Sequence, residues 1–114
     1  MNIGQYNIIA DDVVIEDGAS VGNFNIIKSG TIIRKGAVIG NYCEIGKNND
    51  IGENSILQGR IRTASVCIFE KNVTTKYGVI LTSGVLLKAL GFVNKNLVKE
   101  GIYAGLPVKW IKEK

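Results

Sequence analysis

Histidine is absent from this 114-residue sequence, and proline and tryptophan occur once each. Without histidine the chain has neither a histidine general base nor a histidine-ligated zinc ion, and we expect no bound metal. No apolar run approaches the roughly 20 residues that a membrane helix needs, so we expect no membrane span. Polar Asn2 and Gln5 interrupt the start of the chain, which argues against a signal peptide. The composition therefore indicates one small domain without a linker or a second domain.

What the sequence does contain is a period of six residues. Sixteen positions from Ile3 to Val93 lie six residues apart, and fourteen of them are large and apolar. The two exceptions are Thr63 and Thr75. Four residues after each of these positions lies an uncharged and mostly small residue. Neither a helix, with a period of 3.6, nor a strand, with a period of 2, explains this pattern.

Residues suited to tight corners follow the same period. Three residues after the apolar positions come glycine, asparagine or aspartate: Asp12, Gly18, Gly30, Gly36, Asn48, Asn54, Asn72, Gly78, Gly84 and Asn96. Glycine and asparagine tolerate a left-handed backbone. Three extended segments and three corners then close a triangular coil of about 18 residues, so we predict an all-β, parallel β-helix of about five coils over residues 1–98. A run of β-hairpins, the alternative, would place its turns at irregular spacing.

The two cysteines, Cys43 and Cys67, both fall in the small inward row. Their separation along the chain is not a whole multiple of the coil length, so we expect them on different faces of the prism. We interpret them as buried thiols without a mutual disulfide. Free thiols fit a reducing compartment, and we expect the protein in the cytoplasm.

Apolar residues also recur just before each inward position, where they should point outward. Sorted in steps of 18, they form stripes on two of the three faces. One face carries Val14, Ile32, Asp50, Ile68 and Leu86, and another carries Val38, Ile56, Thr74 and Phe92. The β-propensity of branched residues is one explanation. Because soluble monomers rarely expose such patches, we expect burial between the subunits of a homo-oligomer.

Basic residues gather toward the end of the sequence. Residues 88–114 hold six lysines and two glutamates, a net charge of +4 that equals the net charge of the whole chain. Such an end suits an anionic ligand such as a phosphate, and a solvated tail would have the same composition. Neither an aromatic platform nor a recognition helix accompanies the lysines, so nucleic acid is not expected as a partner.

Three neighbouring motifs resemble those of the hexapeptide-repeat acyltransferases. The stretch "AGLPVKWIK" (104–112) resembles the A-G-x-P-A-[KR]-x-I end of that family, "VNKNLV" (93–98) its V-x-K-D hexad, and "LKALGF" (87–92) its I-G-A-G-S segment. The spacing between the three matches as well. The resemblance implies a left-handed β-helix, a homotrimer with sites in the clefts between subunits, and acetyl-coenzyme A as co-substrate.

By the same resemblance, residues near the C-terminal end line the coenzyme A cleft. They are Ala89, Asn94, Lys95 and Lys112, with Gly105 and Pro107 shaping a loop and Lys109 as a further candidate. Residues 99–114 would form a tail that caps the helix and lines the cleft, and its lysines would bind the phosphates. A turn that caps the prism is compatible with this role.

The missing histidine is the clearest departure from the family. Many members use a histidine as general base, and its absence also excludes the zinc-type carbonic anhydrases of the same fold. A neutral amine needs a strong base less than a hydroxyl does, so we expect an amino sugar as acceptor. N-acetyltransferases that act on nucleotide-linked sugars resemble this chain, including its stretch "EKNVTTKYGVILTSG" (70–84). The resemblance thus implies N-acetylation in surface-polysaccharide synthesis.

Candidate catalytic residues are Glu70 and Asn72, in the "FEKN" hexad where relatives often have E-D-N. Either could orient or deprotonate the acceptor, and each is also compatible with an ordinary corner. Arg60 and Arg62 could bind the diphosphate of a nucleotide-linked sugar or be surface charges. Two other functions stay open, a non-catalytic β-helical assembly or regulatory module and a sugar O-acetyltransferase with a carboxylate base.

Overall fold

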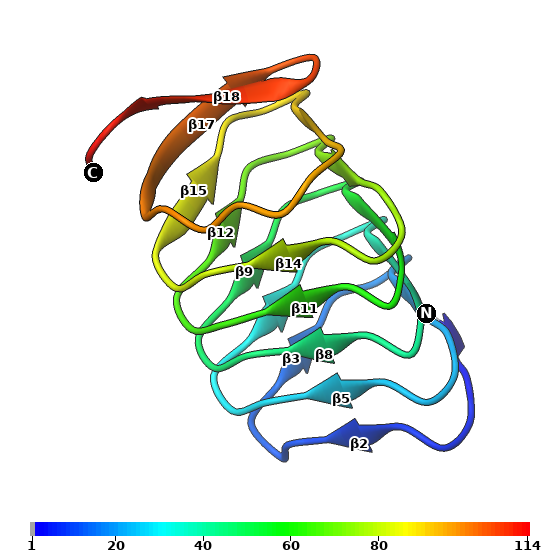
Figure 1. Ribbon diagram of the computed structural model, residues 1–114. Coiled ribbons are helices and arrows are strands. Elements are labelled where there is room, and N and C mark those ends of the chain that lie inside the picture. The colour runs from blue at the N-terminus through cyan, green and yellow to red at the C-terminus, as the bar shows by residue number, and fades with distance from the viewer. Residues whose placement is uncertain (1) are drawn as a thin grey trace.

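The computed structural model describes residues 2–114 as a three-sided prism of stacked coils (Figure 1). Strands form three parallel sheets, and residues 2–114 contain no helix. The predicted all-β, parallel coil architecture is therefore confirmed. The chain makes about six turns, where the hexad count predicted about five. The C-terminal end explains the difference, because residues beyond 98 add the strand of Gly101–Gly105 to one of the sheets and complete the last turn. The left-handed winding stays a prediction of the resemblance.

Each face of the prism is one sheet, and most strands are two residues long. Sheet A contains β1 (Asn2–Ile3), β4 (Ser20–Val21), β7 (Val38–Asn41), β10 (Ile56–Gly59), β13 (Thr74–Thr75) and β16 (Phe92–Val93). Sheet B contains β2 (Ile8–Ile9), β5 (Ile26–Ile27), β8 (Glu44–Ile45), β11 (Arg62–Thr63) and β14 (Ile80–Leu81). Sheet C contains β3 (Val14–Ile15), β6 (Ile32–Ile33), β9 (Asp50–Ile51), β12 (Ile68–Phe69), β15 (Val85–Leu87), β17 (Gly101–Gly105) and β18 (Val108–Lys112).

From β1 to β16, neighbouring coils pair in the same register, each residue with its equivalent one coil later. Val38 lies beside Ile56 in sheet A, and Glu44 lies beside Arg62 in sheet B. Backbone N–H groups donate to the carbonyl groups of the next coil, as the N–H of Glu44 does to the Ile61 oxygen at 2.8 Å. Equivalent residues therefore form straight columns along the prism, and every outward column is a row of potential ligand contacts.

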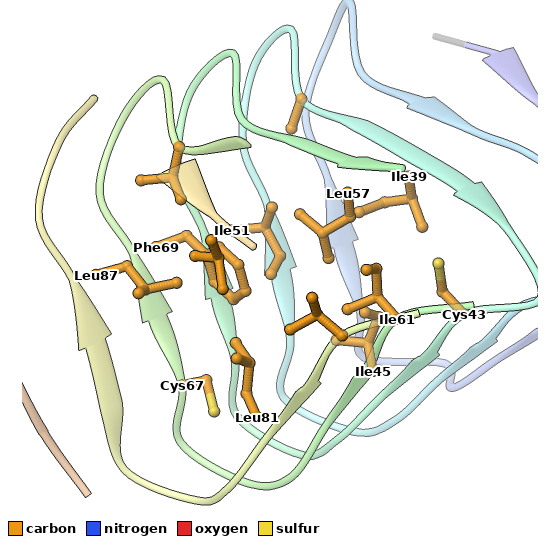
Figure 2. Packing of buried hydrophobic residues seen from close by; sticks show 14 of the residues in the cluster. Ile39, Cys43, Ile45, Ile51, Leu57, Ile61, Cys67, Phe69, Leu81 and Leu87 are labelled. Carbon is orange, nitrogen blue, oxygen red and sulfur yellow. The ribbon is translucent and has the colours of Figure 1, made fainter. Parts of the chain in front are cut away.

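The inward rows form the core (Figure 2). From Val21 onward every large inward position is buried, including Ile39, Ile45 and Ile51. The two threonines of this row are buried as well, and the Thr63 hydroxyl accepts a hydrogen bond from the Gly46 N–H at 3.1 Å. The six-residue pattern thus identified the core correctly, even at its two polar positions.

Cys43 and Cys67 are free, buried thiols, as predicted. Cys43 directly precedes a strand of sheet B and Cys67 a strand of sheet C, so they do lie on different faces. Burial raises the pKa of both thiols, which keeps them protonated and poorly reactive. Their role is to fill narrow inward positions (Figure 2).

The corners repeat more strictly than residue type suggested. Positive φ angles recur every six residues from Gly18 to Leu90, and Tyr6 has one too. Besides glycine and asparagine, this series includes Phe24, Tyr42, Arg60 and Val66, which the sequence did not mark as corners. Two predicted corners, Asp12 and Asn96, lack a positive φ. The fold therefore imposes the left-handed corner on residues that do not favour it.

The C-terminal residues leave the hexad period. Strand β17 extends sheet C beside β15. The register of the coils would place Ala104 next to Leu86, but Ile102 lies there instead. Strand β18 then turns back antiparallel to β17, and Val108 is buried. This hairpin lies at the C-terminal end of the stack (Figure 1). The division into a domain of residues 1–98 and a tail of residues 99–114 remains a prediction.

Val66 provides a test of the corner geometry. It is β-branched, half exposed, and held at a φ of 60° that asparagine accepts at neighbouring corners. We predict that Val66→Asn raises the free energy of unfolding by about 1 kcal/mol, because a strained non-glycine residue is relieved with little loss of packing. Asn54→Val, at a corner with φ of 58°, should lower it by a similar amount. Chemical denaturation at a fixed protein concentration measures both, and equal stabilities for all three proteins would contradict the prediction.

Candidate functional site

A groove of about 720 Å³ runs over the outer face of sheet B, across β8, β11 and β14. Its floor is low because one outward column reads Gly46, Ala64 and Thr82 in successive coils. A larger residue does not fit at position 46 without a shift of the backbone, since an added Cβ would overlap the Ala64 carbonyl oxygen. We call this hollow the B groove, and it lies in the range of typical small-molecule sites.

Charges in the B groove favour an anion. Its lining includes Lys28, Lys47 and Arg62 against one carboxylate, Glu44. Glu44 lies 3.3 Å from the Lys28 amine and 3.5 Å from Nε of Arg62. The Arg62 side chain stays two-thirds exposed, so most of its guanidinium is available to a ligand. Three cations around one carboxylate leave a surplus of positive charge that attracts phosphate groups.

A second hollow, of about 290 Å³, adjoins the B groove at the C-terminal end of the prism. The two share Leu97 and Val98 in their linings, so they lie next to each other. Lys95 and Lys109 line this C-terminal hollow, together with Trp110. An anionic end group of a ligand lying in the B groove would therefore meet these lysines.

Aromatic contacts hold the wall of the C-terminal hollow in place. The Lys99 amine lies 3.6 Å from the centroid of the Trp110 ring, a cation–π contact. The Trp110 indole N–H donates to the Glu100 carbonyl at 3.1 Å, and the Tyr103 hydroxyl donates to the Lys99 carbonyl at 2.6 Å. These contacts fix the position of the hairpin that carries Lys109.

A third hollow, of about 420 Å³, opens at the corner between sheets A and B. It shares Glu44, Arg62 and Ile80 with the B groove. Arg60, Tyr42 and other residues of the corner line its far side. Arg60 and Arg62, predicted from the sequence as substrate contacts, therefore both face hollows on this side of the molecule.

The predicted cofactor residues are only partly brought together. Lys95 and Lys109 share the C-terminal hollow. Gly105 and Pro107 lie at the turn between β17 and β18, and Lys112 ends β18 on the edge of sheet C. Other positions, Ala89 and Asn94, do not line any of the three hollows described above. The cofactor role of all these residues stays a prediction.

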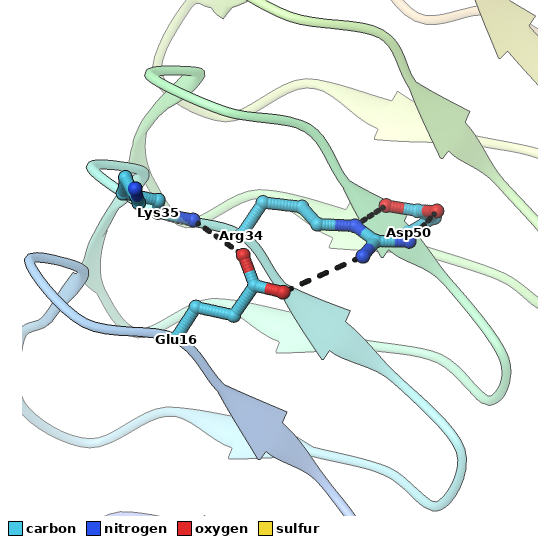
Figure 3. A network of polar contacts seen from close by, with 4 residues as sticks. All are labelled: Glu16, Arg34, Lys35 and Asp50. Atoms are coloured by element: carbon cyan, nitrogen blue, oxygen red, sulfur yellow. Dashed lines mark hydrogen bonds and ion pairs between the residues drawn. The ribbon is translucent and has the colours of Figure 1, made fainter.

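Glu70 lies on sheet C, away from the B groove, and its carboxylate is already engaged. One oxygen accepts the Ala89 N–H at 3.0 Å, and the other lies 3.4 Å from the Lys88 amine. Glu16, in the same column three coils earlier, makes the same two contacts at the same distances, to the Lys35 N–H and to Arg34 (Figure 3). The repeated contact shows that Glu70 braces two coils.

Asn72 has a φ of 58° and is exposed at a corner between sheets C and A. Its backbone N–H donates to the Glu53 carbonyl at 2.8 Å in the preceding coil. In one chain, neither Glu70 nor Asn72 faces Arg60 or Arg62 across a shared hollow. Their catalytic role stays a prediction.

Glu44 is the carboxylate that sequence reasoning missed. It belongs to an outward column of sheet B that reads Ile8, Ile26, Glu44, Arg62 and Ile80. Two opposite charges interrupt an otherwise apolar column, and this signal is readable from the sequence once residues are sorted in steps of 18. It marks the centre of the B groove.

Two negative findings concern the described part of the chain. Across residues 2–114, no three side chains of histidine, cysteine, aspartate or glutamate gather in a group that could hold a metal ion. Within the same residues there is no helix with the length and apolar character needed to cross a membrane.

Solved acetyltransferase structures share this fold. PerB from Caulobacter crescentus, crystallised with CoA and GDP-perosamine, is 22% identical, with 91% of this chain and 53% of that one aligned and a TM-score of 0.75. A hexapeptide transferase family protein from Anaplasma phagocytophilum is 17% identical over 98% of this chain and 83% of its own, with a TM-score of 0.76. The acetyltransferase domain of PglB from Neisseria gonorrhoeae, crystallised with acetyl coenzyme A, is 15% identical over 93% of this chain and 55% of its own, with a TM-score of 0.57.

These likenesses confirm the resemblance to hexapeptide-repeat acetyltransferases at the level of the fold. The chain spans about half the length of PerB and of the PglB domain that it matches. No protein-family model and no curated protein matches the sequence.

Gly46 tests whether the floor of the B groove is as tightly built as its contacts indicate. We predict that Gly46→Ala lowers the free energy of unfolding by about 1–3 kcal/mol, because the new methyl group would force β8 away from the Ala64 carbonyl. Ala64→Gly, in the next coil, should cost less than this because it adds no atom. Thermal unfolding of the two variants compares them, and a fully stable Gly46→Ala protein would contradict the described packing.

Proposed function

We propose that this chain is an acyl-coenzyme A-dependent acetyltransferase that acetylates the amine of a nucleotide-linked amino sugar. The observation that carries the proposal is a pair of adjoining hollows with basic linings, the B groove with Arg62 and the C-terminal hollow with Lys95 and Lys109. Its support from outside the chain is a fold shared with proteins crystallised with CoA, acetyl coenzyme A and GDP-perosamine. Surface-polysaccharide synthesis in the cytoplasm is part of the same proposal.

Coenzyme A matches the two hollows in chemistry. It is a flexible molecule with phosphates at one end, a thiol at the other and two amides between them. Lys95 and Lys109 would hold its phosphates by charge-assisted contacts. Apolar Ile80, Leu97 and Val98 line the stretch toward Arg62 and would cover the pantetheine arm. The thioester would then lie near the middle of the B groove.

The proposed reaction needs no histidine. The neutral amine of the acceptor attacks the thioester carbonyl carbon, a C–N bond forms, and the C–S bond breaks to release coenzyme A. The proton lost by the amine leaves through a carboxylate or water, and the departing sulfur is released as thiolate or thiol. Glu44 lies in the groove where it can orient the amine, next to Lys28 and Arg62. Glu70 and Asn72 would take part from a neighbouring subunit.

A homotrimer is part of the proposal, and sheet A is the face we assign to its interface. On sheet A, Val38 and Ile56 are 39% and 40% exposed in the single chain. Gly40 keeps this face flat beside them. On sheet C the other apolar stripe is crossed by a bidentate ion pair, in which Arg34 binds Asp50 at 3.0 and 2.9 Å (Figure 3). Asp50 and Glu16 raise the pKa of Arg34, so this pair stays charged and favours solvent over an apolar interface.

Specific observations keep a non-catalytic assembly module as the second candidate. The chain has no histidine, and the Glu70 carboxylate is committed to bracing two coils. The two functions differ in coenzyme A binding, which a scaffold has no reason to retain. A sugar O-acetyltransferase with a carboxylate base would use the same groove, and comparison of amino sugars with hydroxyl acceptors separates it.

Lys95 provides the test of cofactor binding. We predict that Lys95→Ala weakens coenzyme A binding about ten-fold, or about 1.4 kcal/mol, because one charge-assisted phosphate contact is lost. Lys71→Ala, an exposed lysine at another corner, is the matched control and should bind like the wild type. Isothermal titration calorimetry measures both, and higher salt should weaken wild type more than Lys95→Ala. Failure of the wild type to bind millimolar coenzyme A would exclude the enzyme and leave the scaffold.

Ile56 tests the assigned subunit interface. We predict that Ile56→Glu dissociates the trimer, because association would bury an unpaired carboxylate. Val14→Glu, the same change on sheet C, should leave the trimer intact. Analytical ultracentrifugation reports the mass of each protein. A monomeric wild type, or dissociation by Val14→Glu alone, would show that the assignment is wrong.

A further inference from the structure

Four side chains stack along the corner between sheets A and B. Tyr6, Phe24 and Tyr42 follow each other in steps of 18, with ring centroids 4.9 and 5.0 Å apart and planes within 13° and 4° of parallel. Above Tyr42, the Arg60 guanidinium carbon lies 4.7 Å from the ring centroid. All four residues have positive φ, between 48° and 62°. We call this series the corner stack.

The next position of the corner stack is empty. Gly78 occupies it, with a φ of 82° and no atom within 4 Å of where a Cβ would lie. In the following coil the Asn96 side chain turns away, accepting the Ile80 N–H at 2.9 Å. Two coil spacings, roughly 9.5 Å, therefore separate the guanidinium from the backbone of the Asn96 coil. One planar ring fits such a gap.

One face of the Arg60 guanidinium is therefore covered by Tyr42, and its other face is turned to this gap. Among residues 2–114, Arg60 forms no ion pair, whereas Arg62 is paired with Glu44. The gap belongs to the corner hollow of about 420 Å³, which Arg60, Gly78, Arg62 and Ile80 all line. An arginine stacked on one side and open on the other offers a flat, cationic surface to a π system.

We propose that the gap above Arg60 is a binding site for the base of a nucleotide, which stacks on the guanidinium in place of the missing side chain at position 78. Arg62 then lies within the same hollow to meet the phosphates. This refines the sequence-based assignment, in which both arginines contacted the diphosphate. The inference rests on the proposed function, because the nucleotide is taken to be the carrier of the amino sugar.

The chemistry favours stacking over hydrogen-bond recognition. Nucleobases stack on arginine guanidinium planes and on aromatic rings. The corner stack already shows that planar groups pack here at about one coil spacing. The ligand ring would become the next member of the same series. Its phosphates would point along sheet B, toward the groove that we assign to acetyl transfer.

Two substitutions test the site. Gly78→Tyr would place a ring in the gap, since Tyr6 and Tyr42 adopt the required backbone in the same series. We expect it to weaken binding of GDP and UDP more than ten-fold, with the same small loss of thermal stability as the control Gly18→Tyr, since both corners have a positive φ. Arg60→Lys keeps the charge and loses the plane, and we expect a five- to ten-fold loss for nucleoside diphosphates and no change for inorganic diphosphate. Gly18→Tyr, at an open left-handed corner elsewhere, is the matched control and should bind like the wild type.

Calorimetry with GDP, UDP, inorganic diphosphate and coenzyme A distinguishes the outcomes. Binding of inorganic diphosphate as tight as that of GDP and UDP, or unchanged GDP and UDP binding in Gly78→Tyr, would overturn the site. Loss of coenzyme A binding alone in both variants would place its adenine there and overturn the assignment to the sugar carrier. Wild-type binding of nucleoside diphosphates with no binding of coenzyme A would support the site and refute the proposed acetyltransferase. Coenzyme A binding with no nucleotide stacking would do the reverse.

Discussion

The hydrogen bond between one coil and the next, which joins equivalent positions of the repeat from β1 to β16, is the constraint on which this structure depends. It builds three sheets at once, because each coil contributes one short strand to every face. A two-residue strand has almost no stability alone, so each coil is held by its neighbours on both sides. The constant register also fixes which residues share a column. The low floor at Gly46 and the stack ending at Arg60 are both consequences of that register.

The fold could be predicted in detail from the sequence because the six-residue phase never breaks through the coils. Even Thr63 and Thr75 are buried where the phase places them. Corners were predicted less completely, since residue type indicates a left-handed backbone only at glycine, asparagine and aspartate. Tyr42 and Val66 adopt it because both flanking strands are fixed by inter-coil hydrogen bonds. The hairpin of β17 and β18 could not be placed, because the pairing of β17 with β15 departs from the register of the coils.

The candidate site was only partly predictable. Lys95 and Lys109 were found because family motifs mark them, and they share a hollow. Glu44 was not predicted, because a lone glutamate in the sequence carries no signal until the register of the coils places it beside Arg62. Glu70 shows the opposite case, since its motif suggested chemistry and its contacts repeat those of Glu16. The recurrence of these contacts in two coils is explained by the bracing of the stack.

The constant coil height gives the path from the corner stack to the C-terminal lysines a discrete length. Each coil adds roughly 4.8 Å of height, so the separation between Arg60 and Lys95 along the prism is set in steps of one coil. Duplication or loss of one coil between them would change this distance by one step and leave both ends chemically intact. The number of coils between Arg60 and Lys95 therefore sets the length that an extended ligand needs in order to contact both residues.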